Sequence, residues 1–291
     1  MKARICLIVL CVLLLCACAT EPEPVPETPS PEPTLAPPVE DTIVVPTQPP
    51  QEVFQLPTPE PDPDTGATPE PLPPLTGFVI GLDPGHQAQE DHDTEPIAPD
   101  AEEQTEKCPA GTRGAVSDVY EYRVNLDVAL KLKALLEANG AKVVMTRSAD
   151  DVHLSNRERA EIFNRSEVDL AIRLHCNGTD DPSVRGAFMM VPTKSRTAYF
   201  AESVRAATAI IERYCAVTGL PVRKNKGVTY RSDQTGFNWC ERPIVCIEMG
   251  YLSNEKEDLL LTNASFQDKM AFGILDGVLS YFNPEASGGG N

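Results

Sequence analysis

Short apolar runs alternate with longer amphipathic segments through residues 77–283 of this 291-residue chain. Most of the apolar runs are continuous, as in parallel strands that are buried on both faces of a sheet. The amphipathic segments repeat their apolar residues at the spacing of a helix. This alternation predicts an α/β fold in which a mostly parallel, mixed sheet is covered by helices on both faces.

Local signals set the expected boundaries of these elements. Gly140 suits the left-handed position after a helix, and Ser155 with Glu158 forms a capping-box pattern at the start of another. The predicted strands span 78–83, 141–146, 168–174, 186–191, 227–230 and 243–248, and the predicted helices span 121–139, 155–164, 195–217, 255–261 and 265–282. Residues 87–119 are predicted to form a long loop, and loops of this length in compact domains are usually functional.

Residues 1–17 have the pattern of a signal peptide. A short positive start is followed by an apolar run from 5 to 16, which is too short for a comfortable membrane span. The run ends in Leu15-Cys16-Ala17-Cys18, which resembles the lipobox of bacterial lipoproteins. That resemblance implies cleavage before Cys18 and lipidation of its thiol. The alternative is a plain signal peptide that is rich in cysteine.

Residues 18–76 have the composition of a linker. Positions 19–76 hold 19 of the 28 prolines and 11 acidic residues, with no Lys or Arg. Such a segment buries too little apolar surface to offset its ordering entropy, so we predict a disordered tether. Proline-rich ligands of SH3 or WW domains are the alternative interpretation. A catalytic domain is predicted at 77–284, followed by a flexible tail at 285–291.

The charge and cysteine patterns exclude some functions. The formal net charge of −18 divides into +2 for the signal segment, −11 for the linker and −9 for residues 77–291. The folded part has no basic excess, which argues against nucleic-acid binding. Five of the nine cysteines lie in the folded part, and their spacing contains no C-x-x-C pattern, so a cysteine zinc site is not indicated.

Polar side chains follow three of the predicted strands. His86 comes after the strand at 78–83, His175 directly follows the strand at 168–174, and Glu248 ends the strand at 243–248. Ligands of open α/β sheets bind outside the carboxyl ends of the strands, so these groups should meet at one edge. Glu121 begins the first long helix and can face the same edge. His92 and His153 follow no strand and indicate no site.

Two imidazoles and two carboxylates at one edge suit a metal hydrolase. A catalytic zinc has three protein ligands and keeps one position open, and a nearby carboxylate serves as general base and then as acid. Each residue alone has an ordinary structural explanation, such as a helix-start carboxylate that complements the macrodipole. The sequence contains no G-x-S-x-G elbow, no glycine-rich phosphate loop and no H-E-x-x-H motif. Cys176 and His175 are neighbours on a strand and point to opposite sides, so they do not suit a nucleophile–base pair.

At these residues the chain resembles the zinc-dependent N-acetylmuramoyl-L-alanine amidases of the amidase_3 family. The resemblance covers about residues 78–283. Its four segments are Asp83-Pro84-Gly85-His86, Glu121-Tyr122-Arg123-Val124-Asn125-Leu126, His175-Cys176-Asn177 and Glu248-Met249-Gly250-Tyr251-Leu252-Ser253-Asn254. Departures from the family are Gln87-Ala88 where many relatives have Gly-Gly, Cys176 where many have alanine, and the long 87–119 loop.

The resemblance implies hydrolysis of the amide between N-acetylmuramic acid and L-alanine in peptidoglycan. It implies that His86, Glu121 and His175 bind Zn²⁺, that Glu248 is the catalytic acid and base, and that Asn177 helps to shape the substrate site. With the lipobox, it implies an exported protein that is anchored by lipid to the outer face of the cytoplasmic membrane, or to the periplasmic side of a membrane, and faces the cell wall.

Some family members are occluded until a partner acts, and residues 87–119 could play that part here. A non-catalytic peptidoglycan-binding lipoprotein and a zinc peptidase acting on stem peptides are the alternative functions.

Overall fold

The computed structural model describes residues 72–223 and 225–283. The predicted signal peptide, Cys18, most of the predicted linker and the predicted tail at 285–291 lie outside the described residues. Leu75 falls within the range predicted as linker, but its side chain is fully buried in the hydrophobic core. In this described part of the chain, no helix is long and apolar enough to cross a membrane.

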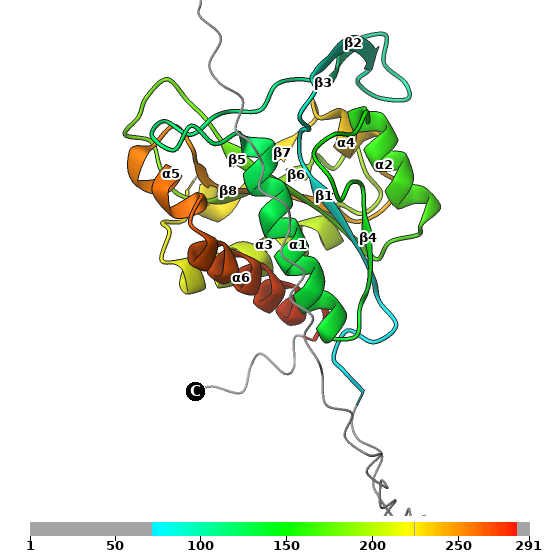
Figure 1. Ribbon diagram of the computed structural model, residues 1–291. Coiled ribbons are helices and arrows are strands. Elements are labelled where there is room, and N and C mark those ends of the chain that lie inside the picture. The colour runs from blue at the N-terminus through cyan, green and yellow to red at the C-terminus, as the bar shows by residue number, and fades with distance from the viewer. Residues whose placement is uncertain (1–71, 224, 284–291) are drawn as a thin grey trace, which may run out of the picture. The chain divides into compact units, whose positions relative to one another are not determined.

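A mixed sheet forms the centre of the described chain (Figure 1). Its six strands are β1 (Val79–Pro84), β4 (Lys142–Met145), β5 (Leu170–Asn177), β6 (Phe188–Pro192), β7 (Val228–Arg231) and β8 (Ile244–Tyr251). They are ordered β4-β1-β5-β8-β6-β7, and β4, β1, β5 and β8 run parallel. β6 is antiparallel to β8 and parallel to β7. The predicted mostly parallel, mixed sheet is confirmed.

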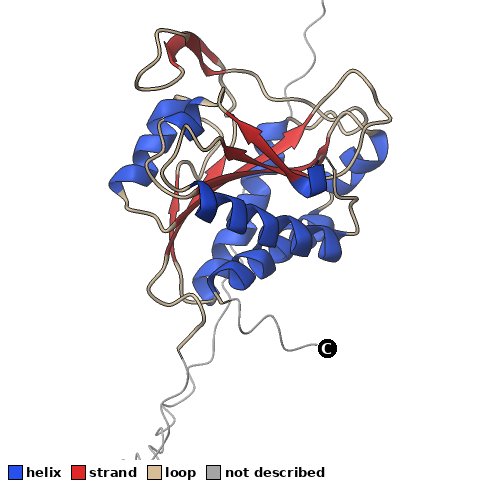
Figure 2. Cartoon of the chain, turned by 180° about the vertical axis from the view of Figure 1, so that it is seen from behind, coloured by secondary structure: helices blue, strands red, loops and turns tan. Residues whose placement is uncertain are grey.

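Helices cover both faces of this sheet (Figure 2). One face carries α1 (Glu121–Ala138), α3 (Phe200–Thr218) and α6 (Ala264–Phe282), and the other carries α2 (Asn156–Arg165) and the short α4 (Thr235–Asn238). α5 (Glu255–Leu261) follows β8, and a 3₁₀ turn (Asn225–Gly227) precedes β7. The predicted capping box at Ser155 is present, as is the positive φ of Gly140 after α1. The helix predicted from 195 begins instead at Phe200.

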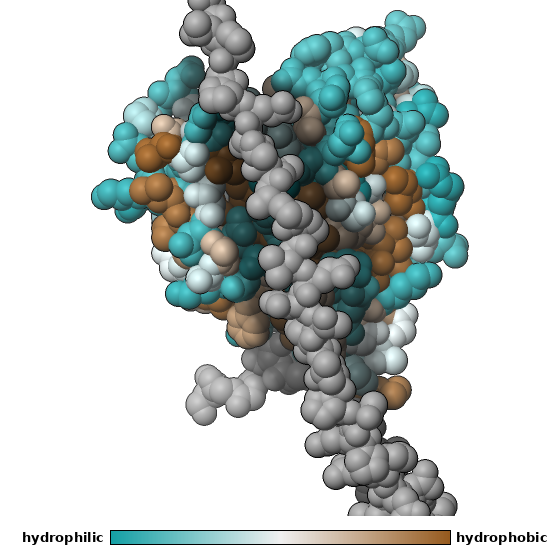
Figure 3. Space-filling model, viewed as in Figure 1, coloured by the Kyte–Doolittle hydropathy of each residue, from teal (hydrophilic) through white to brown (hydrophobic). Residues whose placement is uncertain are grey.

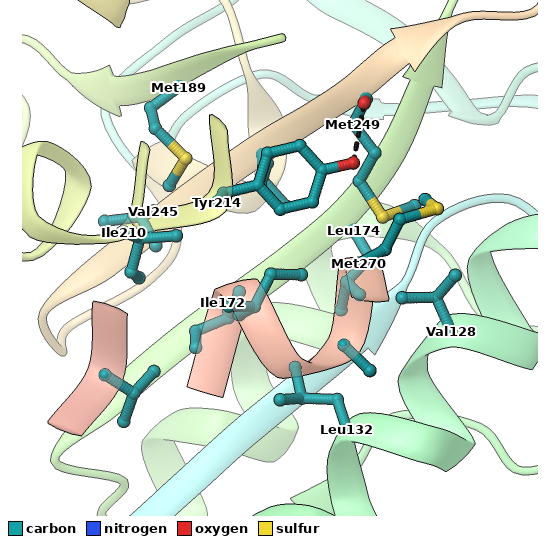
Figure 4. Packing of buried hydrophobic residues seen from close by; sticks show 14 of the residues in the cluster. Val128, Leu132, Ile172, Leu174, Met189, Ile210, Tyr214, Val245, Met249 and Met270 are labelled. Carbon is teal, nitrogen blue, oxygen red and sulfur yellow. Dashed lines mark hydrogen bonds between the residues drawn. The ribbon is translucent and has the colours of Figure 1, made fainter. Parts of the chain in front are cut away.

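The larger core lies between the sheet and α1, α3 and α6 (Figure 4). Leu132, Ile172 and Met270 are fully buried in it. Tyr214 is also fully buried, and its hydroxyl donates a 2.7 Å hydrogen bond to the carbonyl of Met249. A buried hydroxyl without a partner would cost free energy, so this bond lets a tyrosine fill the core. A smaller core of apolar and aromatic residues fills the α2 and α4 face.

Part of the segment predicted as a loop at 87–119 is an antiparallel hairpin of β2 (Asp91–Pro96) and β3 (Gln104–Cys108). Its surface is hydrophilic (Figure 3), so no apolar alternation marked it as strand. The hairpin is held by polar contacts to the α2 and α4 side. Glu95 accepts a hydrogen bond from the backbone N–H of Arg157, and the Trp239 indole donates to the carbonyl of Pro96.

Candidate metal centre

Three of the predicted site residues meet at the carboxyl edge of the sheet. His86 follows β1, Glu121 is the first residue of α1, and His175 lies near the end of β5. Their potential ligand atoms lie within 4.8 Å of one another. Glu121 Oε1 is 3.4 Å from His86 Nε2 and 3.0 Å from His175 Nδ1. The fold therefore brings two imidazoles and a carboxylate into a group that could hold a metal ion.

His86 is oriented by a backbone carbonyl. Its Nδ1 lies 2.8 Å from the carbonyl oxygen of Pro109. A carbonyl can only accept, so Nδ1 carries a proton, and Nε2 is the nitrogen that faces Glu121. Imidazoles that bind metals are commonly fixed in this way by a partner on the other nitrogen.

Glu121 is buried and ionised. Burial alone would raise the pKa of its carboxyl, but the charge of His86 and hydrogen bonds with both imidazoles outweigh burial and hold that pKa well below its usual value. Its Oε2 accepts a hydrogen bond from the Thr112 N–H, and Oε1 accepts one from the Cys176 N–H. Tyr120, the N-cap residue of α1, makes no side-chain cap. The contacts with Thr112 and Cys176 therefore orient the Glu121 carboxylate toward the two imidazoles.

The two imidazoles differ in their electrostatics. Burial lowers the pKa of His175 to about 4, against the opposing effect of its hydrogen bond to Glu121. Burial would also lower the pKa of His86, but Glu121 outweighs burial and raises it above the usual value. His175 is therefore neutral at neutral pH, which is the form of imidazole that binds a metal.

Two glycines let the backbone approach the clustered side chains closely. A Cβ on Gly85 would lie 2.1 Å from Cε1 of His175, which is far inside van der Waals contact. A Cβ on Gly111 would lie 2.9 Å from Glu121 Oε2. A side chain at Gly85 would have to displace the His175 imidazole, and one at Gly111 would press on the Glu121 carboxylate.

Glu248 stands beside this group. It pairs in register with His175 on the neighbouring strand β8, and only 8% of its surface is exposed. A pocket of about 550 Å³ is lined by Glu248 and the three clustered residues together with residues 110–112, 176–180 and Ser253. Asn177 reaches this pocket, but its Oδ1 accepts a hydrogen bond from the N–H of Gly178. No residue from 87 to 109 lines this pocket, so the β2–β3 hairpin is not part of its wall.

Two contacts to Glu121 were not predicted from the sequence. Asn125 donates a 3.2 Å hydrogen bond to Glu121 Oε1 and another to the carbonyl of Gly85. The spacing of four residues from Glu121 on one helix is a signal that could have indicated it. Thr112 acts through its backbone N–H, which leaves no signature in residue type.

His92, His153 and four of the five described cysteines do not line this pocket. Cys176 does. His92 pairs with Glu90 and Glu106 on the hairpin side of the chain. All five cysteines within residues 72–223 and 225–283 are buried and free. Burial raises the pKa of Cys176 well above its usual value, so its thiol is protonated beside the site.

Comparisons with known proteins show the family of this chain. Residues 80–280 match the Amidase_3 family, described as N-acetylmuramoyl-L-alanine amidase. The germination-specific N-acetylmuramoyl-L-alanine amidase of Bacillus subtilis is 30% identical over 226 residues, covering 72% of this chain and 81% of the relative. LytC of the same organism is 28% identical, with 72% of this chain and 36% of the relative covered.

Solved structures of such amidases have a similar fold. Ami1 from Mycobacterium smegmatis superposes with a TM-score of 0.67 at 24% identity, over 72% of this chain and 99% of that one. CwlD from Clostridioides difficile, solved in complex with the GerS lipoprotein, gives 0.58 at 26% identity, over 71% and 99% of the two chains.

Proposed function

The chain belongs to the Amidase_3 family of N-acetylmuramoyl-L-alanine amidases, and we propose that it works with a zinc ion held by His86, Glu121 and His175. It is a peptidoglycan amidase, which hydrolyses the amide between N-acetylmuramic acid and L-alanine. The observation that supports the proposed zinc site is the placement of one carboxylate oxygen between two imidazole nitrogens.

The distances between these donor atoms fit zinc. Zinc binds imidazole nitrogen and carboxylate oxygen at about 2.0–2.2 Å in tetrahedral geometry, so neighbouring donors lie roughly 3.3 Å apart. Glu121 Oε1 lies 3.4 Å from His86 Nε2 and 3.0 Å from His175 Nδ1. When bound, zinc supplies a Lewis acid that polarises a carbonyl and makes water more acidic. Three protein ligands leave the open position that a catalytic site requires.

We propose that Glu248 transfers the proton. Its carboxylate lines the same pocket as the three ligands and is held on the strand next to His175. It would take a proton from the attacking water and return it to the departing nitrogen of L-alanine. Asn177, at the end of β5, would help to shape the wall against which the substrate lies.

The test compares Glu248→Gln with Glu241→Gln, which changes an exposed carboxylate ahead of the same strand. Glu248→Gln should lose about 10²–10⁴-fold in turnover of peptidoglycan and keep its zinc, because general acid–base catalysis contributes about that much. Glu241→Gln should behave as wild type. Normal turnover by Glu248→Gln would remove this residue from the mechanism.

The products of digestion separate the candidate functions. Chelator-sensitive release of intact stem peptides that begin with L-alanine, identified by mass spectrometry, is the expected result. Shortened stem peptides would indicate a zinc peptidase instead. Zinc binding with no release would indicate a peptidoglycan-binding protein.

We further propose that the mature protein is anchored through Cys18 and that residues 18–76 tether residues 77–284 within reach of the cell wall. The support is the Leu15-Cys16-Ala17-Cys18 sequence and the proline-rich, acidic composition that follows it. Labelling of bacteria with a fatty-acid analogue should mark the wild-type protein but not Cys18→Ser. Equal labelling of both proteins, or labelling of neither, would contradict the anchor.

A further inference from the structure

The backbone at His86 has an uncommon conformation. Its φ is +59°, in the left-handed region that residues other than glycine rarely adopt. A conformation of this kind persists only when the surrounding structure holds it. At His86 the surrounding structure acts through backbone carbonyls, because those of Pro84, Gly85 and His86 all accept hydrogen bonds from buried arginines.

Arg159 contributes most directly to this restraint. It lies on α2, only 1% of its surface is exposed, and its guanidinium donates four hydrogen bonds to residues 83–87. Nη1 donates to the carbonyl of Pro84 at 3.0 Å and to Asp83 Oδ1 at 2.8 Å. Nη2 donates to the carbonyl of His86 at 3.1 Å and to Gln87 Oε1 at 2.8 Å. The Arg159 guanidinium therefore hydrogen-bonds to residues before and after His86 as well as to His86 itself.

Arg147 adds to this restraint. It is 3% exposed, and its Nε donates to the carbonyl of Pro84 at 2.9 Å. Its Nη2 donates to the carbonyl of Gly85 at 3.2 Å and to that of Tyr122 at 2.7 Å. Tyr122 is next to Glu121, so Arg147 ties the segment that carries one imidazole to the helix that carries the carboxylate.

We infer that Arg159 is a positioning residue for the metal centre, which acts by holding the carbonyls of Pro84 and His86 so that the His86 imidazole faces Glu121 and His175. This inference rests on the proposed zinc site and adds a residue that touches neither the metal ligands' side chains nor the pocket. A guanidinium suits the task because its donors are fixed in one plane, whereas the ammonium of lysine is a single point charge.

Arg173 offers a matched control within the same cluster. It is 4% exposed and donates to the other oxygen of Asp83 at 2.8 Å. Its second partner is Asn156 Oδ1 on α2, and its side chain makes no hydrogen bond to residues 84–87 in the described structure. Arg159→Lys and Arg173→Lys therefore each disturb an ion pair with the same buried carboxylate, Asp83, and both keep the positive charge. Only the first releases the segment that carries His86.

The experiment measures zinc binding by competition with a chromophoric chelator in the full-length protein and in both variants. Thermal unfolding of the metal-free proteins reports on folding, and the visible spectrum of the cobalt-substituted proteins reports on ligand geometry. Arg159→Lys should bind zinc about 10–100-fold more weakly, as is typical when a group that orients a ligand is lost. At saturating zinc its kcat should fall while KM changes little. Arg173→Lys should keep wild-type zinc affinity and an unchanged cobalt spectrum.

Equal zinc affinity in wild type and Arg159→Lys would overturn the inference, as would equal losses in the two variants. If Arg159→Lys does not fold, the experiment uses Arg147→Lys. The Arg147→Lys variant leaves the Asp83 ion pairs intact and should show the same loss of zinc affinity. A wild-type protein that binds no zinc would overturn the proposed metal centre as well. Zinc binding by wild type with no loss in Arg159→Lys would overturn the positioning role alone.

Discussion

Replacing Gly85 with alanine should expel His175 from the proposed metal centre without substituting any of the three proposed ligands. The new Cβ would lie 2.1 Å from Cε1 and 2.2 Å from Nε2 of the imidazole. Carbon atoms rest at about 3.5–4.0 Å, so the two groups must separate by more than about 1 Å. The Gly85 backbone is fixed by its N–H on the carbonyl of Leu174 and by Arg147 and Asn125 on its own carbonyl. The imidazole must therefore move.

The size of this movement sets the expected loss. Metal–ligand distances tolerate deviations of about 0.2 Å, so a shift of about 1 Å removes one of three ligands. We expect zinc affinity to fall at least about 100-fold, which corresponds to about 2.7 kcal/mol of binding free energy. Overpacking should also lower the free energy of unfolding of the metal-free protein by about 1–3 kcal/mol.

Gly277→Ala is the matched control. On α6 its Cβ would lie 2.4 Å from the Cα of Ile210, which is a comparable clash remote from the metal ligands. Chelator competition, thermal unfolding without metal and peptidoglycan digestion are measured on both variants. Gly277→Ala should lose stability but keep its zinc affinity. The reasoning is refuted if Gly85→Ala binds zinc as tightly as wild type, or if both variants lose the same affinity.

Three further outcomes follow from burial and charge. Burial raises the pKa of Cys215 to about 11 and that of Cys240 to about 12, so a thiol reagent at about pH 8 should label them only after unfolding. Burial would raise the pKa of Asp83, but Arg159 and Arg173 hold it far below its usual value of about 3.9. The contribution of ionised Asp83 to the free energy of unfolding is thus complete at a pH above that value, and it declines as the pH falls below it. In urea unfolding, Asp83→Asn should cost about 3–5 kcal/mol near pH 7, and its difference from wild type should shrink toward about pH 3. Zinc at about 100 times its Kd should raise the free energy of unfolding by about 2.7 kcal/mol, and thermal scans should show no such gain for His86→Ala or with chelator.

The sequence predicted the central strands and the order of the site residues along them. β1, β5 and β8 are mostly apolar, and His86, His175 and Glu248 lie toward their carboxyl ends, although β5 and β8 extend past His175 and Glu248 to Asn177 and Tyr251. Parallel pairing of these strands was sufficient to bring His86, His175 and Glu248 together. Composition does not encode which strand is reversed, and the antiparallel direction of β6 depends on its connections to β5 and β7.

Other elements escaped prediction for physical reasons. The β2–β3 hairpin has mostly exposed polar strands and depends on distant partners such as Trp239. α4 has four residues, which is too short to show a helical period. The start of α3 is delayed because the preceding polar residues bond locally: the N–H of Arg196 donates to the carbonyl of Thr193, and that of Tyr199 to Thr197 Oγ1. Partners that act through backbone, such as Pro109 at His86, have no signature in residue type.

The missing side-chain cap of α1 has a consequence for local order. The Glu121 carboxylate contacts the histidines and accepts a hydrogen bond from the N–H of Thr112, while its own N–H donates to the Thr112 carbonyl. These reciprocal bonds close a short ring over residues 112–121, and the ring shares its last residue with the first turn of the helix. Removal of the proposed zinc should therefore increase fraying of that turn. Native-state hydrogen exchange should show faster exchange at the amides of residues 122–124 in the metal-free protein, while the strands of the central sheet keep their protection.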